Sequence, residues 1–342
     1  MIESGGAPSV DASLSSQDWR KRLARYAKPD DGRAVGQLLT TAVPLLASAA
    51  GLFWGLAQGF WPALLCALPT ALFLVRLFII QHDCGHGSYF RSGRVNNAVG
   101  RALGVITLMP YAAWRRDHAI HHAGSGNLAR RGVGDVTTLT VAEYRARSRW
   151  GRLAYRLYRH PLVLFIVGPA YVLLLRYRLP LANSFHDRRS WLSILGTDVA
   201  AAALAAGIAA LAGPAALLAG WGSALLLASA IGVWFFYVQH QFEDTYWRPA
   251  GSWDFHAAAL EGCSFYDLPR ILHWVTGSIG FHHIHHLASR IPNYRLRSCF
   301  EENPELRQAK RLTLWSSVRA TRLALWDEER QRLVSFRQAL AA

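Results

Sequence analysis

The segment FHHIHHL, residues Phe281–Leu287, holds four histidines in five consecutive positions between two apolar ends. At about 100° per helical residue, His282, His285 and His286 fall within an arc of roughly 100° and would form one three-pronged face. His283 lies at the edge of that face. Histidines with this spacing point in one direction and can bind one ion, so we expect the fold to bring further ligands to this face.

The same i, i+3, i+4 spacing occurs at His118, His121 and His122, and a shorter i, i+4 version occurs at His82 and His86. The three clusters are far apart in the sequence. Each of them adjoins a strongly apolar segment or an aromatic one. We therefore predict that the clusters converge on one metal centre beside a membrane.

The composition favours an integral membrane protein. Of the 342 residues, 52% are hydrophobic and 17% are charged, and the 13 Trp and 12 Tyr are typical of aromatic belts at bilayer interfaces. The net charge of +15 comes from basic residues beside apolar runs, which fits attraction to anionic headgroups. A nucleic-acid partner is not predicted, because no binding motif places these residues on a soluble face. The four cysteines form no CxxC pair and are expected to be reduced.

Hydropathy divides the chain into two pairs of predicted spans. Val35–Ile80 contains one charged residue, Arg76, and is long enough for two spans of about 20 residues each. A second apolar region is split by Gly213-Pro214. The four predicted spans lie near 37–57, 61–81, 192–212 and 216–238. The apolar stretch 162–175 is short for a span and is broken by Gly168-Pro169, so we expect a re-entrant or interfacial helix there.

The number of spans between the histidine clusters gives the predicted topology. Clusters that build one site must lie on one side of the membrane, so an even number of spans must separate His122 from His282. Four spans in two hairpins place both termini and the arginine-rich stretches in the cytosol, as the positive-inside rule asks. We thus expect an all-α integral membrane protein, in a bacterial inner membrane, with interfacial helices and a cytosolic histidine-rich cap for two metals. Its predicted parts are a polar basic tail (1–33), a membrane domain (34–300) and a cytosolic amphipathic helical tail (301–342).

His240 emerges from the fourth predicted span much as His82 emerges from the second, and it completes a set of nine candidate metal ligands. The set is His82, His86, His118, His121, His122, His240, His282, His285 and His286. One tetrahedral zinc site needs about four ligands, so nine imidazoles suffice for two metals. A structural metal clip would not need so many.

The donor type narrows the chemistry. Neutral nitrogen donors suit Zn, Cu, Fe and Ni. A pair of irons can activate O2 to attack a C–H bond in a chain that the bilayer supplies, which explains why a polar site is held against lipid. Asp83, Asp117 and His283 are predicted to support the ligand imidazoles by hydrogen bonds. For His283, the role of an alternative ligand stays open.

The clusters read His82-Asp83-Cys84-Gly85-His86, His118-x-x-His121-His122 and His282-x-x-His285-His286, in this order and with hydrophobic spacers between them. They resemble the three histidine boxes of membrane fatty-acid desaturases, most closely the acyl-lipid type that includes the Δ12 (ω-6) enzymes. The resemblance extends to Gln239-His240 and to Ile291-Pro292-Asn293-Tyr294, and it covers roughly residues 40–300.

The resemblance implies a di-iron centre bound by the eight histidines of the boxes, with His240 as the extra histidine upstream of the third box. It implies that electrons come from a separate ferredoxin or cytochrome b5-type donor and its reductase. It further implies that O2 is reduced to water while two hydrogens are removed from a membrane-lipid acyl chain. His283 departs from the family pattern. No His-Pro-Gly-Gly haem signature occurs, so no fused cytochrome b5 domain is expected.

Two other functions are compatible with the clusters. Hydroxylation or ketolation of a carotenoid, sterol or alkane would use the same scaffold, because the outcome depends on where the substrate carbons sit relative to the irons. A metal or haem transporter predicts histidines within the spans, lining a path, whereas these histidines cluster at the predicted cytosolic ends.

Overall fold

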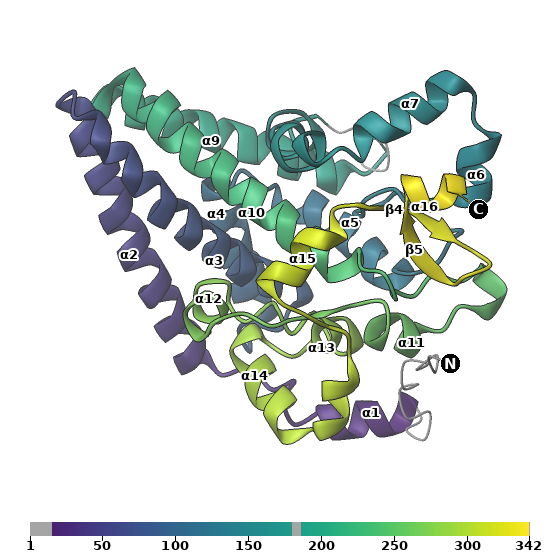
Figure 1. The fold of residues 1–342 in the computed structure, drawn as a ribbon. Helices are drawn as coiled ribbons and strands as arrows, with labels where there is room; N and C mark the ends of the chain where they lie inside the picture. The colour runs from purple at the N-terminus through teal and green to yellow at the C-terminus, as the bar shows by residue number, and fades with distance from the viewer. Residues whose placement is uncertain (1–15, 180–185, 342) are drawn as a thin grey trace.

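Helices dominate the structure, and two small β-sheets accompany them. The computed structural model describes residues 16–179 and 186–341, so residues 1–15 of the predicted tail 1–33 lie outside the described part. In Figure 1 the long helices gather on the left, and most of the shorter C-terminal elements, green to yellow, lie below and to the right. The prediction of an all-α fold is therefore right for most of the chain, and the two small sheets depart from it.

The first hairpin is formed by α2 (Asp31–Ala57) and α3 (Ala67–His86), which the 3-10 helix η1 (Trp61–Cys66) joins. The predicted spans 37–57 and 61–81 lie inside this hairpin. Both of its arms are long and apolar enough to cross a membrane. His82 and His86 lie on the last turns of α3.

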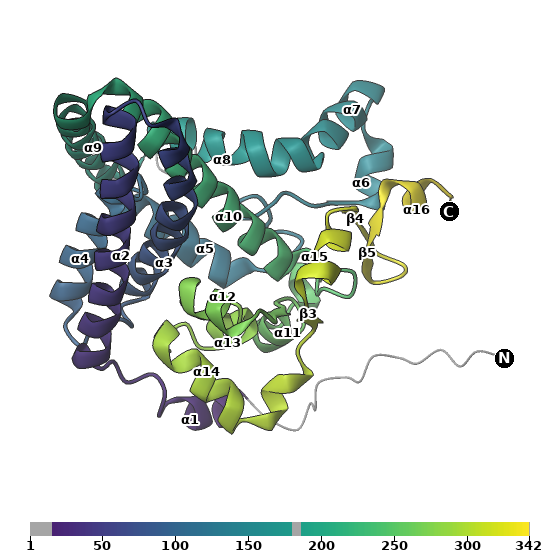
Figure 2. The same cartoon turned by 60° about the vertical axis from the view of Figure 1, so that its left-hand side comes forward.

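The second hairpin is a helical run of 53 residues that breaks near its middle. It comprises α9 (Arg188–Ala215), the π-helix η5 (Ala216–Trp221) and α10 (Gly222–His240). Inside the run Gly213 adopts φ 85° and ψ 166°, a conformation that glycine reaches without strain, and Pro214 follows it. The break falls between the third and fourth predicted spans, and the chain reverses its direction there (Figures 1 and 2).

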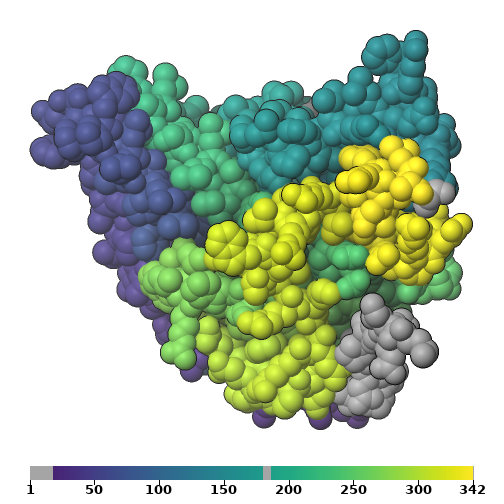
Figure 3. All heavy atoms as spheres, in the orientation of Figure 1, coloured from purple at the N-terminus to yellow at the C-terminus, as the bar shows by residue number. Residues whose placement is uncertain are grey.

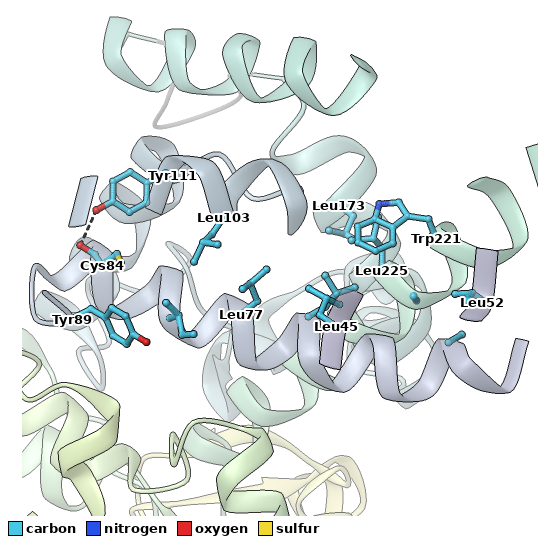
Figure 4. Close-up of a cluster of buried hydrophobic side chains, with 14 of the residues drawn as sticks. Leu45, Leu52, Leu77, Cys84, Tyr89, Leu103, Tyr111, Leu173, Trp221 and Leu225 are labelled. Atoms are coloured by element: carbon cyan, nitrogen blue, oxygen red, sulfur yellow. Dashed lines mark hydrogen bonds between the residues drawn. The ribbon is translucent and has the colours of Figure 1, made fainter. Parts of the chain in front are cut away.

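Both hairpins turn at the same end of the bundle. Gly220 of η5 packs so closely on α2 that a Cβ there would lie 3.0 Å from Leu56 Cδ1, and Figure 2 shows the two turns close together at the top. α3 and α10 therefore run toward the opposite end, where they finish at His86 and His240. The apolar core that holds the hairpins together includes Leu45, Leu52, Leu77, Leu173, Trp221 and Leu225 (Figure 4).

The segment between the hairpins forms a bent pair of helices. α7 (Arg149–Tyr158) meets the helical segment Val163–Arg176 at 59°, a bend that suits a broken span or a re-entrant loop. Two π-helical stretches, η2 (Val163–Val167) and η3 (Val172–Arg176), flank α8 (Gly168–Tyr171) in this segment. Figure 2 shows the segment with α8 pointing away from α2 and α3, toward α7, rather than running alongside them. The stretch predicted as re-entrant or interfacial is thus a separate helical unit.

Shorter elements surround the ends of α3 and α10, and Figure 3 shows the C-terminal part of the chain, olive to yellow, covering one face of the molecule. The helices are α1 (Ser16–Leu23), α4 (Gly93–Ile106), α5 (Tyr111–Gly124), α6 (Val141–Ala146), α11 (Phe255–Leu260), α12 (Arg270–Val275), α13 (His282–Leu287), α14 (Asn293–Glu302), α15 (Leu314–Ala320) and α16 (Phe336–Ala341), with the 3-10 turns η6 (Ala250–Ser252) and η7 (Pro304–Gln308). In one sheet β2 (Phe265–Tyr266) pairs in parallel with β3 (Arg311–Leu312).

The C-terminal tail contains a β-hairpin, so the prediction of a helical tail over 301–342 is wrong in part. β4 (Leu323–Asp327) pairs antiparallel with β5 (Arg332–Ser335) and parallel with β1 (Leu139–Thr140). By spacing alone, the arginines and apolar residues of this tail fit an amphipathic helix. In the fold, Asp327 Oδ1 accepts the backbone N–H of Arg330 and closes a turn, and the residues on either side of this turn bury their apolar side chains as strands.

A buried arginine connects α2, α3 and α12. Arg76 of α3 is 4% exposed. Its Nε donates a hydrogen bond to Thr41 Oγ1 in α2 at 3.0 Å, and its guanidinium lies 4.2 Å from the centre of the Trp274 ring in α12. Arg76, the one charged residue between Val35 and Ile80, therefore attaches α12 to the helical bundle. α12 is the helix that precedes α13 in the chain.

We expect Thr41→Val to lower the free energy of unfolding by about 1–3 kcal/mol, because a buried charged donor loses its acceptor. Thr40→Val is the matched control, since the exposed Thr40 hydroxyl bonds only to carbonyls of its own helix. Thermal unfolding in detergent measures both variants against the original protein. Equal melting temperatures for the two variants would contradict the role given to Thr41.

Candidate metal centre

The first group of histidines joins three helices at one point. It consists of His82 and His86 of α3, His118 and His122 of α5, and His285 of α13, whose ring nitrogens lie within 4.8 Å of one another. The i, i+4 spacing places each helical pair on one face. The structure thus brings together members of all three predicted clusters.

A second group lies beside the first. His121 of α5, His240 at the end of α10 and His286 of α13 also have ring nitrogens within 4.8 Å of one another. His282 joins this group, because its Nε2 lies 3.0 Å from His240 Nε2. The His122 and His286 rings stack with their centres 4.0 Å apart, so the groups are neighbours. Adding His282 to the eight residues of the two groups accounts for all nine predicted ligands.

The ring nitrogens are spaced for a shared cation rather than for hydrogen bonds. His118 Nε2 lies 3.0 Å from the Nε2 atoms of His82, His86 and His122. A neutral imidazole nitrogen either donates one proton or accepts one bond, so three such contacts cannot all be hydrogen bonds. Two nitrogens at right angles around one ion, each roughly 2.1 Å from it, would be about 3.0 Å apart. The buried His286 Nε2 has no hydrogen-bond partner either. The donor set fits metal ions.

Burial keeps these imidazoles in the form that binds a metal. Desolvation holds the pKa values of His118, His121 and His122 well below the ordinary histidine value, and neighbouring imidazoles lower them further. Because protonation is suppressed, each ring stays neutral and offers a lone pair. Burial lowers the pKa values in α13 in the same way, at His282, His285 and His286.

Asp83 fixes the orientation of His82. Its Oδ1 lies 3.0 Å from His82 Nδ1, so Nδ1 carries the proton and Nε2 presents its lone pair to the other histidines. The second oxygen, Oδ2, accepts hydrogen bonds from the backbone N–H of Asn293 at 2.6 Å and from its Nδ2 at 2.9 Å. This carboxylate, 1% exposed, therefore holds the His82 ring and also joins α3 to the start of α14. Its role as the support of a metal ligand stays a prediction.

Asp117 and His283, the other two predicted supports, make different contacts. Asp117 Oδ2 accepts hydrogen bonds from Arg176 at 2.8 Å and from Tyr177 at 3.2 Å, which ties α5 to the end of η3. His283 is fully buried, with its ring centre 6.0 Å from that of Phe300. Within the described part of the chain, neither residue belongs to the two groups of ring nitrogens.

Three supporting residues are absent from the sequence prediction. The Trp114 ring stacks on His118 with centres 4.6 Å apart, and its position four residues earlier on the same helix is a signal that could have found it. Asn293 belongs to the conspicuous Ile-Pro-Asn-Tyr motif. Cys263 Sγ lies 3.7 Å from His240 Nδ1, and nothing in its spacing indicates this, because a loop places it.

Known proteins match this chain along most of its length. A family model described as Fatty acid desaturase matches residues 58–318. A fatty acid desaturase of Bacillus subtilis (strain 168) is 42% identical over 317 residues, which cover 93% of this chain and 90% of that protein. Two Synechocystis proteins, an sn-1 acyl-lipid omega-3 desaturase (ferredoxin) and an sn-1 oleoyl-lipid 12-desaturase, are 30% and 28% identical. Those matches cover 66% and 67% of this chain and 62% and 64% of the relatives.

Two neighbouring groups of histidines that could hold metal ions thus lie at one end of a bundle of helices that are long and apolar enough to cross a membrane. The chain belongs to the fatty acid desaturase family. Its enzymatic activity is accordingly that of a fatty acid desaturase.

We expect Asp83→Asn to lower the metal content per folded chain, or the turnover, roughly 10- to 100-fold. The amide NH2 would face His82 Nδ1 and favour the wrong tautomer. Asp117→Asn is the control, since Asp117 is also a buried acid of a histidine-bearing helix but has no imidazole partner. Elemental analysis of the purified, folded variants is the measurement. Metal loss that is equal in the two variants would contradict the orienting role of Asp83.

Proposed function

We propose that this chain is a membrane di-iron enzyme that uses O2 to introduce a double bond into the acyl chain of a lipid. The observation that carries the proposal is the division of nine buried or half-buried imidazoles into neighbouring groups of five and four. One iron would be held by His82, His86, His118, His122 and His285. The other would be held by His121, His240, His282 and His286.

Iron is the metal that fits both the ligands and the family. Imidazole suits Zn, Cu, Fe and Ni alike, but zinc has no redox chemistry and cannot serve an oxidation. Bound iron supplies the activation of O2. The chain's own residues hold the site: Asp83 fixes the His82 tautomer, Trp114 stacks on His118, and burial excludes water from the ring nitrogens.

The reaction needs electrons from outside the chain. Removing two hydrogens from the acyl chain provides two electrons, whereas reducing O2 to two waters takes four. A donor must therefore deliver the other two electrons, and two protons must accompany them. We propose a ferredoxin or cytochrome b5-type protein with its reductase as this donor. The Synechocystis relative that is named as a ferredoxin enzyme supports the choice.

The apolar surface supports a lipid substrate and a four-span topology. Leu46 of α2 and Val199 and Leu211 of α9 expose 69%, 72% and 91% of their surface, as side chains that face lipid do. The hairpin turns and the histidines lie at opposite ends of the bundle. We propose that the histidine end and both termini are cytosolic, in a bacterial inner membrane, because the two hairpin turns, near 58–60 and 213–216, contain no Lys or Arg.

The alternatives have less support. The two Synechocystis relatives are an acyl-lipid and an oleoyl-lipid desaturase, which favours a double bond over a hydroxyl or keto group as the product. A metal or haem transporter would line a path with histidines along the helices, whereas the nine imidazoles gather at the ends of α3 and α10 and on the short helices α5 and α13.

Expression in a bacterial host that lacks this activity is expected to produce new double bonds in membrane-lipid acyl chains. The fatty-acid profile by gas chromatography and mass spectrometry is the measurement. Products that retain oxygen would show hydroxylation or ketolation instead. A profile unchanged with iron-loaded protein and an electron donor present would contradict desaturation.

His285→Ala is expected to remove most of the iron, whereas His283→Ala should keep close to two irons per folded chain. Both residues lie on α13 and are fully buried, so the two variants leave similar cavities and differ in which imidazole faces the ring nitrogens. Elemental analysis of the monodisperse fraction gives the ratio. Iron retained in His285→Ala, or lost equally from both variants, would remove His285 from the ligand set.

A further inference from the structure

A cleft lined by arginines lies on α7, away from the metal centre. Its volume is about 310 Å³, and it is lined by Tyr144, Arg149, Arg152, Leu153, Arg156 and Leu340. Figures 1 and 2 show α6, α7 and α16 together at the edge of the molecule, apart from α3 and α13. The metal centre makes no use of these residues.

The cleft carries positive charge without a counter-charge. Within the described part of the chain, Arg149, Arg152 and Arg156 form no ion pair. The one acid of the segment 141–158 is Glu143, and Arg131 already binds both of its oxygens, at 2.6 and 2.7 Å. The three guanidinium groups are exposed. Among the described residues, no carboxylate side chain beside the cleft is left to cancel the attraction that a bound anion would meet.

The opposite side of α7 is anchored to the rest of the protein. Tyr155 Oη donates a hydrogen bond to the Ala324 carbonyl of β4 at 2.6 Å. The buried Arg159, at the end of the helix, donates from Nη2 to Gln241 Oε1 at 2.9 Å. These contacts hold α7 in place without Arg149 or Arg152. Arg156 also takes part in docking, because its Nε donates a hydrogen bond to Tyr144 Oη at 2.7 Å and its guanidinium lies 5.3 Å from the centre of the Phe336 ring.

An apolar strip runs beside the arginines. At about 100° per residue the three arginines fall within roughly 60° of the helix, and Trp150, Leu153 and Leu157 occupy the adjacent arc. These three side chains expose 67%, 45% and 56% of their surface. α7 then meets the apolar segment Val163–Arg176 at 59°, where Ile166 and Val167 expose 63% and 56% of their surface. Exposed apolar side chains therefore continue from α7 into the next helical segment.

We propose that this cleft binds the phosphate of an anionic phospholipid headgroup, with the acyl chains lying along the apolar strip. Guanidinium forks match phosphate oxygens in pairs, and arginines beside exposed tryptophan and leucine are typical of helices at a bilayer surface. An acidic soluble protein would use the charges but not the strip. The other arginine pocket, at Arg22 and Arg25, is neutralised by its own Glu305 and Glu302.

Binding of a fluorescent phosphatidylglycerol to the full chain in an uncharged detergent tests the proposal. Arg149→Gln/Arg152→Gln is the test variant, because both side chains are exposed and Tyr155 and Arg159 still hold the helix. Arg94→Gln/Arg101→Gln removes the same charge from exposed positions on α4 and is the control. Melting temperature and metal content verify that each variant is folded.

The expected result is a preference for phosphatidylglycerol over phosphatidylcholine that falls roughly 10- to 30-fold in the test variant and persists in the control. Unlabelled phosphatidylglycerol should displace the probe, whereas inorganic phosphate should not. The proposal is overturned if the test variant keeps the preference or if both lipids bind equally. Competition by inorganic phosphate as strong as that by the lipid would also overturn the proposal, because it indicates a site for free anions. So would a test variant that binds the lipid normally but loses turnover that depends on the electron donor, because this indicates a docking site for a protein. The binding assay needs no turnover, so it fails or succeeds independently of the proposed reaction.

Discussion

Nine neutral imidazoles held together away from water are the constraint on which the structure depends. Several of their nitrogens lie about 3.0 Å apart, and His118 Nε2 has three such contacts, more than the one hydrogen bond that a neutral ring nitrogen can make. Buried polar atoms without partners destabilise a fold, so the histidine end is costly until a metal binds. A bound metal would therefore add to the stability of the fold, to which packing and hydrogen bonds such as that between His82 and Asp83 also contribute.

α3 organises this arrangement more than any other element. It carries two histidines of the first group, and it also fixes both flanks of the six-residue helix α13, which is too short to hold its place alone. On the N-terminal side, Arg76 attaches α12 through Trp274. On the C-terminal side, Asp83 binds Asn293 at the start of α14. α10, in the second hairpin, ends at His240. Because both hairpins turn at the same end of the bundle, the ends of α3 and α10 lie together at the other end, where His240 contacts the other histidines.

Features with a repeated spacing or a long apolar run could be predicted from the sequence. The spacing of the histidines predicted their shared helical faces. The long apolar runs, each with one charged residue, and the Gly213-Pro214 break predicted two helical hairpins. Features set by tertiary contacts were not predictable in this way. The β4–β5 hairpin pairs with β1, which lies far earlier in the chain. Asp117, like Asp83, lies next to a histidine in the sequence, yet its carboxylate forms an ion pair with Arg176. The division of the ligands into two groups likewise depends on α10 and α13 meeting.

X-ray absorption spectroscopy at the iron edge of the purified, iron-loaded protein tests the central claim most directly. The account predicts two irons per chain, each with imidazole scattering and no sulfur among its neighbours, since the ligand groups contain only histidine. Sulfur scattering would contradict it, as would a single iron site or a spectrum without imidazole. Any of these results would mean that the nine histidines do not form two neighbouring iron sites.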